Sequence, residues 1–244
     1  MASRPLTEPR FAGFPPEARK FLRSLKRNNR REWFQPRKEQ FETQVKAPML
    51  ALIAELNRGL MKFAPELVTD PKKSVFRIYR DTRFSADKTP YKTHIAASFR
   101  RRGSDQTGAG GFYFSVSLDQ IEIAGGLWRP APETTLLVRT HIAERYPELR
   151  RILADKKARK LAGELQGDEL TRAPKGFDPG HPALDLNKKK DWILDVTLEP
   201  SLATTPELHH EILIRLRAMA PLIEYLNRPL VGRKPPRDSL ELHL

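Results

Sequence analysis

Several runs of residues in the middle of the chain alternate apolar and polar side chains, which is the pattern of half-buried β-strands. Only Asp119 and Gln120 connect two of these runs. Strands joined by such short links must be antiparallel, because a parallel crossover needs a dozen or more residues. With one further strand near the C-terminus, the sequence predicts a mostly antiparallel sheet of about five strands. The expected strands are residues 76–84, 91–99, 112–118, 121–123 and 192–198.

Apolar residues at helical spacing predict helices before and after these strands. Pro48 lies inside the second helical pattern and should kink or divide it. We expect a single α+β domain over residues 1–230, with its sheet packed by N-terminal and C-terminal helices. A mobile polar tail is expected over residues 231–244. The expected helices cover residues 16–25, 32–60, 133–145, 147–161 and 205–226.

Charge is the clearest compositional signal. The chain has 44 Lys and Arg against 30 Asp and Glu, a formal net charge of +14, which favours an anionic partner. It has no cysteine, so disulfides, thiol catalysis and cysteine-based metal sites are excluded. Residues 1–10 show no apolar run of a secretory signal, and no window is apolar enough to span a membrane. These features predict a cytoplasmic protein that does not insert into membranes.

The sequence motifs of several large enzyme classes are absent. There is no phosphate-binding P-loop, no HExxH zinc motif, no GxSxG nucleophile elbow and no GxGxxG dinucleotide fingerprint. The six histidines show no metal-ligand spacing, so we predict no metal site and can name no cofactor. A carboxylate-only magnesium site leaves little trace in a sequence, and this alternative stays open.

The segment of residues 76–94 is the densest in reactive side chains. It holds five cations, two aspartates, two tyrosines and a histidine. A regular strand would place Arg80 on the same face as Phe76 and Ile78, where its charge needs a carboxylate or another anion. Residues 85–90 have the composition of a turn. We therefore expect two strands joined by a turn, with the chemistry of the protein concentrated on them.

Three interpretations of this segment remain open. In the first, the arginines pair with the aspartates in a purely structural network. In the second, the surplus of about three positive charges binds the oxygens of a phosphate or carboxylate. In the third, the protein is an enzyme of the hydrolase or phosphoryl-transfer type, in which His94 acts as an acid or base with Asp81 or Asp87.

The second interpretation is preferred, with a phosphorylated small molecule or nucleotide ahead of nucleic acid as the partner. Two glycines and a tryptophan after the middle strands are added to the site, because paired glycines can present backbone N–H groups to an anion. The candidate ligand-binding residues are Arg77, Tyr79, Arg80, Arg83, Lys88, Tyr91, Lys92, Gly125, Gly126 and Trp128.

The same segment resembles a known family. Residues 77–92, with the sequence RIYRDTRFSADKTPYK, resemble the hallmark of a bacterial and fungal family catalogued as domain of unknown function 2461. Supporting features are NN at 28–29, EWF at 32–34, GGLW at 125–128, PKGF at 174–177 and HP at 181–182. The resemblance covers roughly residues 11–230. It implies positions for a shared site, and it implies no activity, cofactor, oligomeric state or catalytic residue.

Two structural criteria separate the interpretations. A concave pocket lined by Arg77, Arg83, Lys88 and Lys92 would favour a small molecule, whereas a broad basic surface with exposed aromatic rings would favour nucleic acid. Acid–base catalysis requires His94 within hydrogen-bond reach of an aspartate of the segment.

Overall fold

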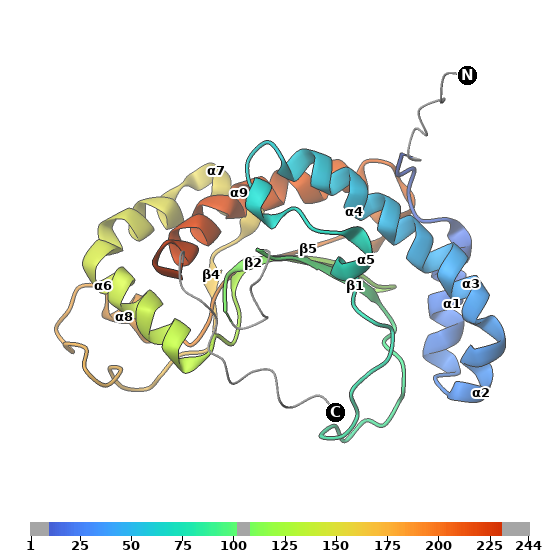
Figure 1. The fold of residues 1–244 in the computed structure, drawn as a ribbon, viewed down its shortest axis with the longest axis horizontal. Helices are drawn as coiled ribbons and strands as arrows, with labels where there is room; N and C mark the ends of the chain where they lie inside the picture. The colour runs from blue at the N-terminus through green and yellow to red at the C-terminus, as the bar shows by residue number, and fades with distance from the viewer. Residues whose placement is uncertain (1–9, 102–107, 231–244) are drawn as a thin grey trace, which may run out of the picture. The chain divides into compact units, whose positions relative to one another are not determined.

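The structure is a computed structural model that describes residues 10–101 and 108–230. It is an α+β fold built on an antiparallel five-stranded sheet with the strand order β1-β2-β3-β5-β4 (Figure 1). This confirms the predicted fold class. The strands are β1 (Ile95–Phe99), β2 (Gly111–Val116), β3 (Ile121–Leu127), β4 (Leu165–Gln166) and β5 (Trp192–Leu198).

The helices lie on both sides of the strands in the sequence, as expected. Among the described residues, no helix combines the length and hydrophobicity needed to cross a bilayer. The α-helices are α1 (Pro16–Arg27), α2 (Arg31–Phe34), α3 (Lys38–Gln40), α4 (Ala47–Leu60), α5 (Pro71–Ser74), α6 (Pro132–Ala154), α7 (Lys156–Ala162), α8 (Leu184–Asn187) and α9 (Leu208–Asn227).

The chain divides into two compact units. Unit 1 comprises Met1–Phe99, Tyr113–Ile123 and Thr197–Ile214, and unit 2 comprises Arg100–Phe112, Ala124–Val196 and Arg215–Leu244. The expectation of one domain over residues 1–230 stays a prediction. The expected tail at residues 231–244 lies outside the described residues.

Unit 1 has an aromatic core at its N-terminal end. Phe21 of α1 contacts Phe34 and Phe41 at ring-centroid distances of 6.2 and 6.1 Å. The helix predicted over residues 32–60 is divided, with a π-helical segment (Phe41–Lys46) before α4. Pro48 lies at the start of α4, where the lack of a proline N–H and the clash of its ring with the preceding turn disfavour regular α-helical hydrogen bonding.

Unit 2 places the second half of α9 over the end of β3. A Cβ atom at Gly125 would lie 3.0 Å from the Met219 sulfur, so the helix packs directly on the strand backbone at this point. Helix α6 bends at Arg145, which has non-helical dihedral angles, two residues before Pro147. The break predicted between residues 145 and 147 is thus a kink within α6.

The prediction of a regular strand over residues 76–84 is wrong. This part of the chain pairs with the following segment only through isolated bridges, Val75 with Ala97 and Tyr79 with Tyr91. Four residue steps separate Val75 from Tyr79 but six separate Tyr91 from Ala97, so the pairing register shifts and a continuous ladder cannot form. For the same reason the regular strand begins at Ile95 and not at Tyr91.

Candidate functional site

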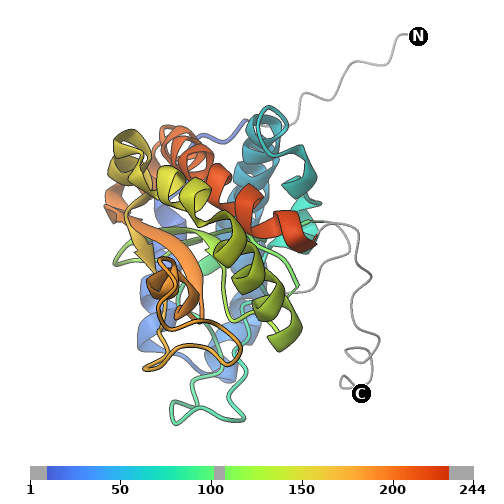
Figure 2. The same cartoon turned by 90° about the vertical axis from the view of Figure 1, so that its left-hand side faces the viewer.

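The signature segment forms an irregular hairpin in unit 1. We call residues 75–94 the motif hairpin. Its two sides are held together by backbone hydrogen bonds from Lys92 to Ile78 at 2.8 Å and from Arg80 to Pro90 at 2.9 Å. Beyond these bonds the chain runs into a turn that projects away from β1, which is visible in both ribbon views (Figures 1 and 2). The turn carries most of the charged residues of the signature.

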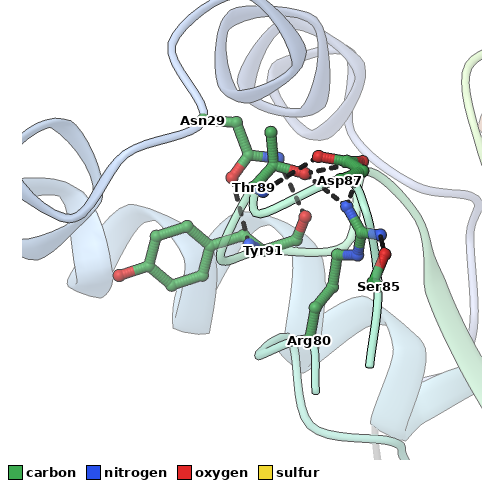
Figure 3. Close-up of polar contacts among 6 residues, drawn as sticks. All are labelled: Asn29, Arg80, Ser85, Asp87, Thr89 and Tyr91. Atoms are coloured by element: carbon green, nitrogen blue, oxygen red, sulfur yellow. Dashed lines mark hydrogen bonds and ion pairs between the residues drawn. The ribbon is translucent and has the colours of Figure 1, made fainter. Parts of the chain in front are cut away.

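The base of the motif hairpin is fixed by Asn29, which follows α1. Its side-chain amide donates to the carbonyl oxygen of Tyr91 at 2.8 Å and accepts from the N–H of the same residue at 3.0 Å (Figure 3). The Tyr91 ring is buried and stacks on Phe34 with ring centroids 4.2 Å apart. Burial raises the pKa of Tyr91. Tyr91 therefore holds the hairpin in place, and its ring is not available to a ligand.

Arg80 organises the turn from the inside. Its guanidinium group donates to the Asp87 carboxylate, the Thr89 hydroxyl and, at 3.4 Å, the Ser85 hydroxyl (Figure 3). The backbone N–H of Thr89, followed by Arg80, lowers the pKa of Asp87 to about 2. The regular strand from which the need of Arg80 for an anion was inferred does not form, and the pairing carboxylate comes from the same hairpin; a role of Arg80 in ligand binding stays a prediction.

The second aspartate is also paired within the turn. Asp81 accepts two hydrogen bonds from the Arg83 guanidinium at 3.1 and 2.9 Å, and these bonds lower the pKa of Asp81 to about 2. Both side chains are well exposed, so the pair contributes little to the free energy of unfolding. Its effect is to fix where the Arg83 charge lies.

Three cations of the hairpin have no such partner. Within residues 10–101 and 108–230, no carboxylate forms an ion pair with Arg77, Lys88 or Lys92. Lys88 donates to the Thr82 carbonyl at 2.9 Å, whereas the Lys92 nitrogen lies 5.1 Å from the centroid of the Phe76 ring. The five predicted cations therefore separate into two that are neutralised locally and three that are not.

Arg77, Lys92 and His94 influence one another as charges of the same sign. We call these three residues the basic cluster. Burial and the charge of Arg77 lower the pKa of Lys92, and burial and the charge of Lys92 lower the pKa of His94. Arg77 also lowers the pKa of Asp81, without an ion pair between the two groups. Lys92 and His94 are half-buried and Arg77 is exposed, so the cluster is reached from solvent at the Arg77 side.

The geometric requirement for acid–base catalysis has no support in the described contacts. Asp81 and Asp87 are each bonded to an arginine, and neither is hydrogen-bonded to His94. The charges that act on His94 are cationic rather than carboxylate. The described residues also contain no group of three or more side chains able to hold a metal ion.

Two aromatic rings of the hairpin are open to solvent. Phe84 at the turn is 95% exposed, and the guanidinium carbon of Arg83 lies 5.7 Å from the centroid of its ring. Tyr79 is 42% exposed and also contacts the buried Tyr91, with ring centroids 5.3 Å apart. The criterion for nucleic-acid binding asked for a broad basic surface and for exposed aromatic rings. Phe84 and Tyr79 meet the second part of it.

The glycines and the tryptophan of the predicted site belong to unit 2. Gly126 has φ +144°, and a Cβ atom there would overlap the carbonyl oxygen of Trp192. Trp128 is 59% exposed and carries the guanidinium carbon of Arg129 at 4.8 Å from its ring centroid. Packing thus accounts for the glycines within unit 2, and the grouping of these residues with the motif hairpin stays a prediction.

Asn29 was missed as a site residue. The sequence placed residues 28–29 between two expected helices and among the features of the family resemblance, but nothing in the local pattern shows that the Asn29 side chain binds the backbone of a residue 62 positions later. The available signal was the pair of asparagines at 28–29 among the features that support the family resemblance.

The comparison with protein families agrees with the resemblance carried by the hairpin. A family model described as "Conserved hypothetical protein (DUF2461)" matches residues 17–225, which includes the motif hairpin and most of both units. No curated protein and no solved structure matches the chain. Because the match covers well over half of the sequence, the chain belongs to this family of conserved hypothetical proteins, DUF2461.

Proposed function

We propose that this protein binds an anionic, phosphate-bearing small molecule or nucleotide at the basic cluster of the motif hairpin. The observation that supports the proposal is the division of the hairpin's charges. Both of its aspartates are used by Arg80 and Arg83, whereas Arg77 and Lys92 lie close enough to repel each other. A purely structural network would place its carboxylates between the cations.

Phosphate chemistry fits these groups better than a single weak anion does. An arginine offers a planar fork of donors, and a lysine adds a compact charge that follows the ligand. A phosphate group with nearly two negative charges at neutral pH relieves the repulsion between Arg77 and Lys92. Half-burial of Lys92 strengthens the attraction, because screening by water is reduced there.

Replacing Lys92 with glutamine is expected to weaken binding of pyrophosphate or ATP about tenfold or more, since a charge-assisted hydrogen bond is worth roughly 1.5–3 kcal/mol. The measurement is isothermal titration calorimetry on the full chain, with the ligand-induced shift in melting temperature as a second readout. Lys73→Gln removes an exposed cation of α5 and is the matched control. Equal affinity of the Lys92→Gln variant and the native protein for these ligands would exclude this site.

As the pH falls from 8 to about 6, binding of the phosphate ligand by the native protein is expected to tighten relative to binding by His94→Asn. In the free protein, burial and Lys92 hold the pKa of His94 below its ordinary value of 6.5, so the ring is neutral at pH 7. A bound anion favours the protonated ring and raises this pKa, so binding takes up a proton. The dissociation constant of the native protein should therefore decrease toward acid pH relative to that of His94→Asn, because protonation of the ligand itself affects both proteins equally. A pH profile that His94→Asn leaves unaltered would remove His94 from the site.

Nucleic acid is a second candidate, favoured by the exposure of Phe84 next to Arg83. Bases stack on exposed rings, and Lys and Arg contact the phosphates. Titration with a short single-stranded oligonucleotide at several salt concentrations distinguishes the two partners. An affinity that falls steeply with salt and is lost in Phe84→Ala supports nucleic acid, whereas a small phosphate ligand does not need this ring.

A further inference from the structure

A second potential binding site lies in unit 2, along one face of α6. Two adjoining cavities, of about 370 and 380 Å³, run between this helix and the loop of residues 170–181. They share Leu136, Lys175 and Phe177 as lining residues and so form one continuous groove, which we call the α6 groove. Figures 1 and 2 both show the loop passing beside α6. The volume is in the range of small-molecule sites.

The wall of the first cavity contains an arginine without a counter-charge. Arg139 is half-buried and donates one hydrogen bond, to the Lys189 carbonyl at 3.0 Å. Its Nε atom is shielded from solvent and has no hydrogen-bond partner, and no carboxylate of the described chain pairs with the guanidinium group. Arginine stays protonated in proteins, and a partly desolvated charge without an anion is unfavourable. A ligand carboxylate in the first cavity would supply the missing charge.

The middle of the α6 groove is apolar. The Leu136 side chain of α6 is 57% exposed. It lines both cavities together with Phe177 of the loop. Pro174, which is buried, supports the same wall of the first cavity. Leu136 and Phe177 together give the groove an apolar surface against which an apolar ligand group can pack. The ligand therefore carries an apolar body next to its anionic group.

The second cavity has the opposite charge. Glu144 and Asp178 line it, and both carboxylates are exposed, with Asp178 accepting an N–H from Gly180 at 2.8 Å. Lys175 lines both cavities and adds the same positive charge to each. The first cavity therefore stays more positive than the second. Arg139 and Glu144 are five residues apart on α6, so they differ by about 7.5 Å along the helix axis and by about 140° around it, and they lie at opposite edges of the face that lines the groove. A ligand with a carboxylate at one end and an ammonium group at the other matches this order of charges along the groove.

We propose that the α6 groove binds a small zwitterion of the amino-acid or short-peptide class. The ligand carboxylate pairs with Arg139, an apolar side chain packs on Leu136 and Phe177, and the ammonium group faces Glu144. This site is separate from the phosphate site of the motif hairpin and does not depend on it. It also gives a role to residues 174–177, a part of the family signature that the proposed function leaves unused.

The test uses the dipeptide leucyl-phenylalanine with free ends, its N-acetylated form and its C-terminal amide. Calorimetric titration of the full chain should give saturable binding of the free dipeptide. We expect the dissociation constant of each blocked form to be higher by about tenfold or more. Equal affinity for all three forms would overturn the zwitterion assignment. No saturation by the free dipeptide at millimolar concentration would overturn the site itself.

Two variants locate the binding in the groove. Arg139→Gln should weaken binding of the free dipeptide about tenfold while the protein still folds, because the charge it removes has no partner in the free protein. Leu136→Ala removes an exposed side chain and should weaken binding without changing the melting temperature. Arg151→Gln, an exposed cation elsewhere on α6, is the matched control. Native affinity in both Arg139→Gln and Leu136→Ala would place the ligand elsewhere and refute the proposal.

Discussion

Replacing Gly126 with alanine is expected to destabilise the protein by about 4 kcal/mol, a large part of the 5–15 kcal/mol typical of a folded domain. The added Cβ atom would overlap the carbonyl oxygen of Trp192 and would lie 2.9 Å from the Ile193 Cα. Both contacts are with the backbone of β5, the sheet neighbour of β3, and cannot be relieved by a side-chain rotation. The φ angle of +144° adds strain that alanine tolerates poorly. Chemical denaturation followed by circular dichroism measures the loss.

Gly176→Ala distinguishes the two causes of the expected destabilisation, which are the backbone overlap and the positive φ angle. Gly176 also has a positive φ angle, +85°, but a Cβ atom there would meet nothing within 4 Å. The expected loss is about 1 kcal/mol, from the backbone conformation alone. If Gly126→Ala unfolds at the same denaturant concentration as Gly176→Ala, the close approach of the two strands is not as tight as described.

The packing role of Gly126 affects what a loss of phosphate binding in a Gly126 variant would mean. Gly126 was predicted to present its backbone to an anion, and the structure gives it a packing role that is sufficient to explain the residue. A Gly126 variant that no longer binds phosphate is therefore uninformative unless its fold is intact. Variants of Lys92 and Arg77 on the hairpin surface are the better probes of the site.

Replacing Asn29 with alanine is expected to lower the free energy of unfolding by about 2–3 kcal/mol. The variant loses two hydrogen bonds, and the N–H and C=O of the buried Tyr91 are left without partners. For a chain of this size the change corresponds to a decrease of roughly 4–12 °C in melting temperature. Amide hydrogen exchange should rise most at Tyr91 and Lys92, where the hairpin is anchored.

Asn28→Ala is the matched control for this prediction. Asn28 is the adjacent residue, and its side chain donates one hydrogen bond, to the Ser24 carbonyl at the end of α1. We expect a loss of about 1 kcal/mol and no change in exchange at Tyr91. Equal effects of the two substitutions would mean that Asn29 acts as a helix-end residue and does not anchor the motif hairpin.

The sequence predicted the elements whose cause is local. Alternation identified β1, β2, β3 and β5, and the carboxylate that pairs with Arg80 comes from Asp87 only seven residues away. It did not predict features that depend on distant segments. The register shift in the motif hairpin, the contact of Asn29 with Tyr91 and the unpaired charge of Arg139 arise from tertiary packing, and spacing along the chain cannot show them.

The α6 groove illustrates this limit. Leu136 and Arg139 have unremarkable positions in a helical pattern, and the sequence placed both in an ordinary amphipathic helix. Only the loop of residues 170–181, which packs beside α6, makes a groove of them. Whether the Arg139 guanidinium group has a counter-charge depends on all of its neighbours in the fold, and the spacing along the helix does not show it.

The ion pairs of the motif hairpin have a consequence for the affinity of binding and for its dependence on pH. Because Arg80 and Arg83 hold the turn through contacts within the hairpin itself, the turn does not need a ligand to acquire its shape. A preorganised surface loses little conformational entropy when it binds, so affinity is retained even for a small ion with few contacts. The low pKa values of Asp81 and Asp87 keep both carboxylates charged from mildly acidic to alkaline conditions. The two ion pairs of the turn should thus stay charged across the range of pH found in living cells, whereas His94 of the basic cluster responds within it.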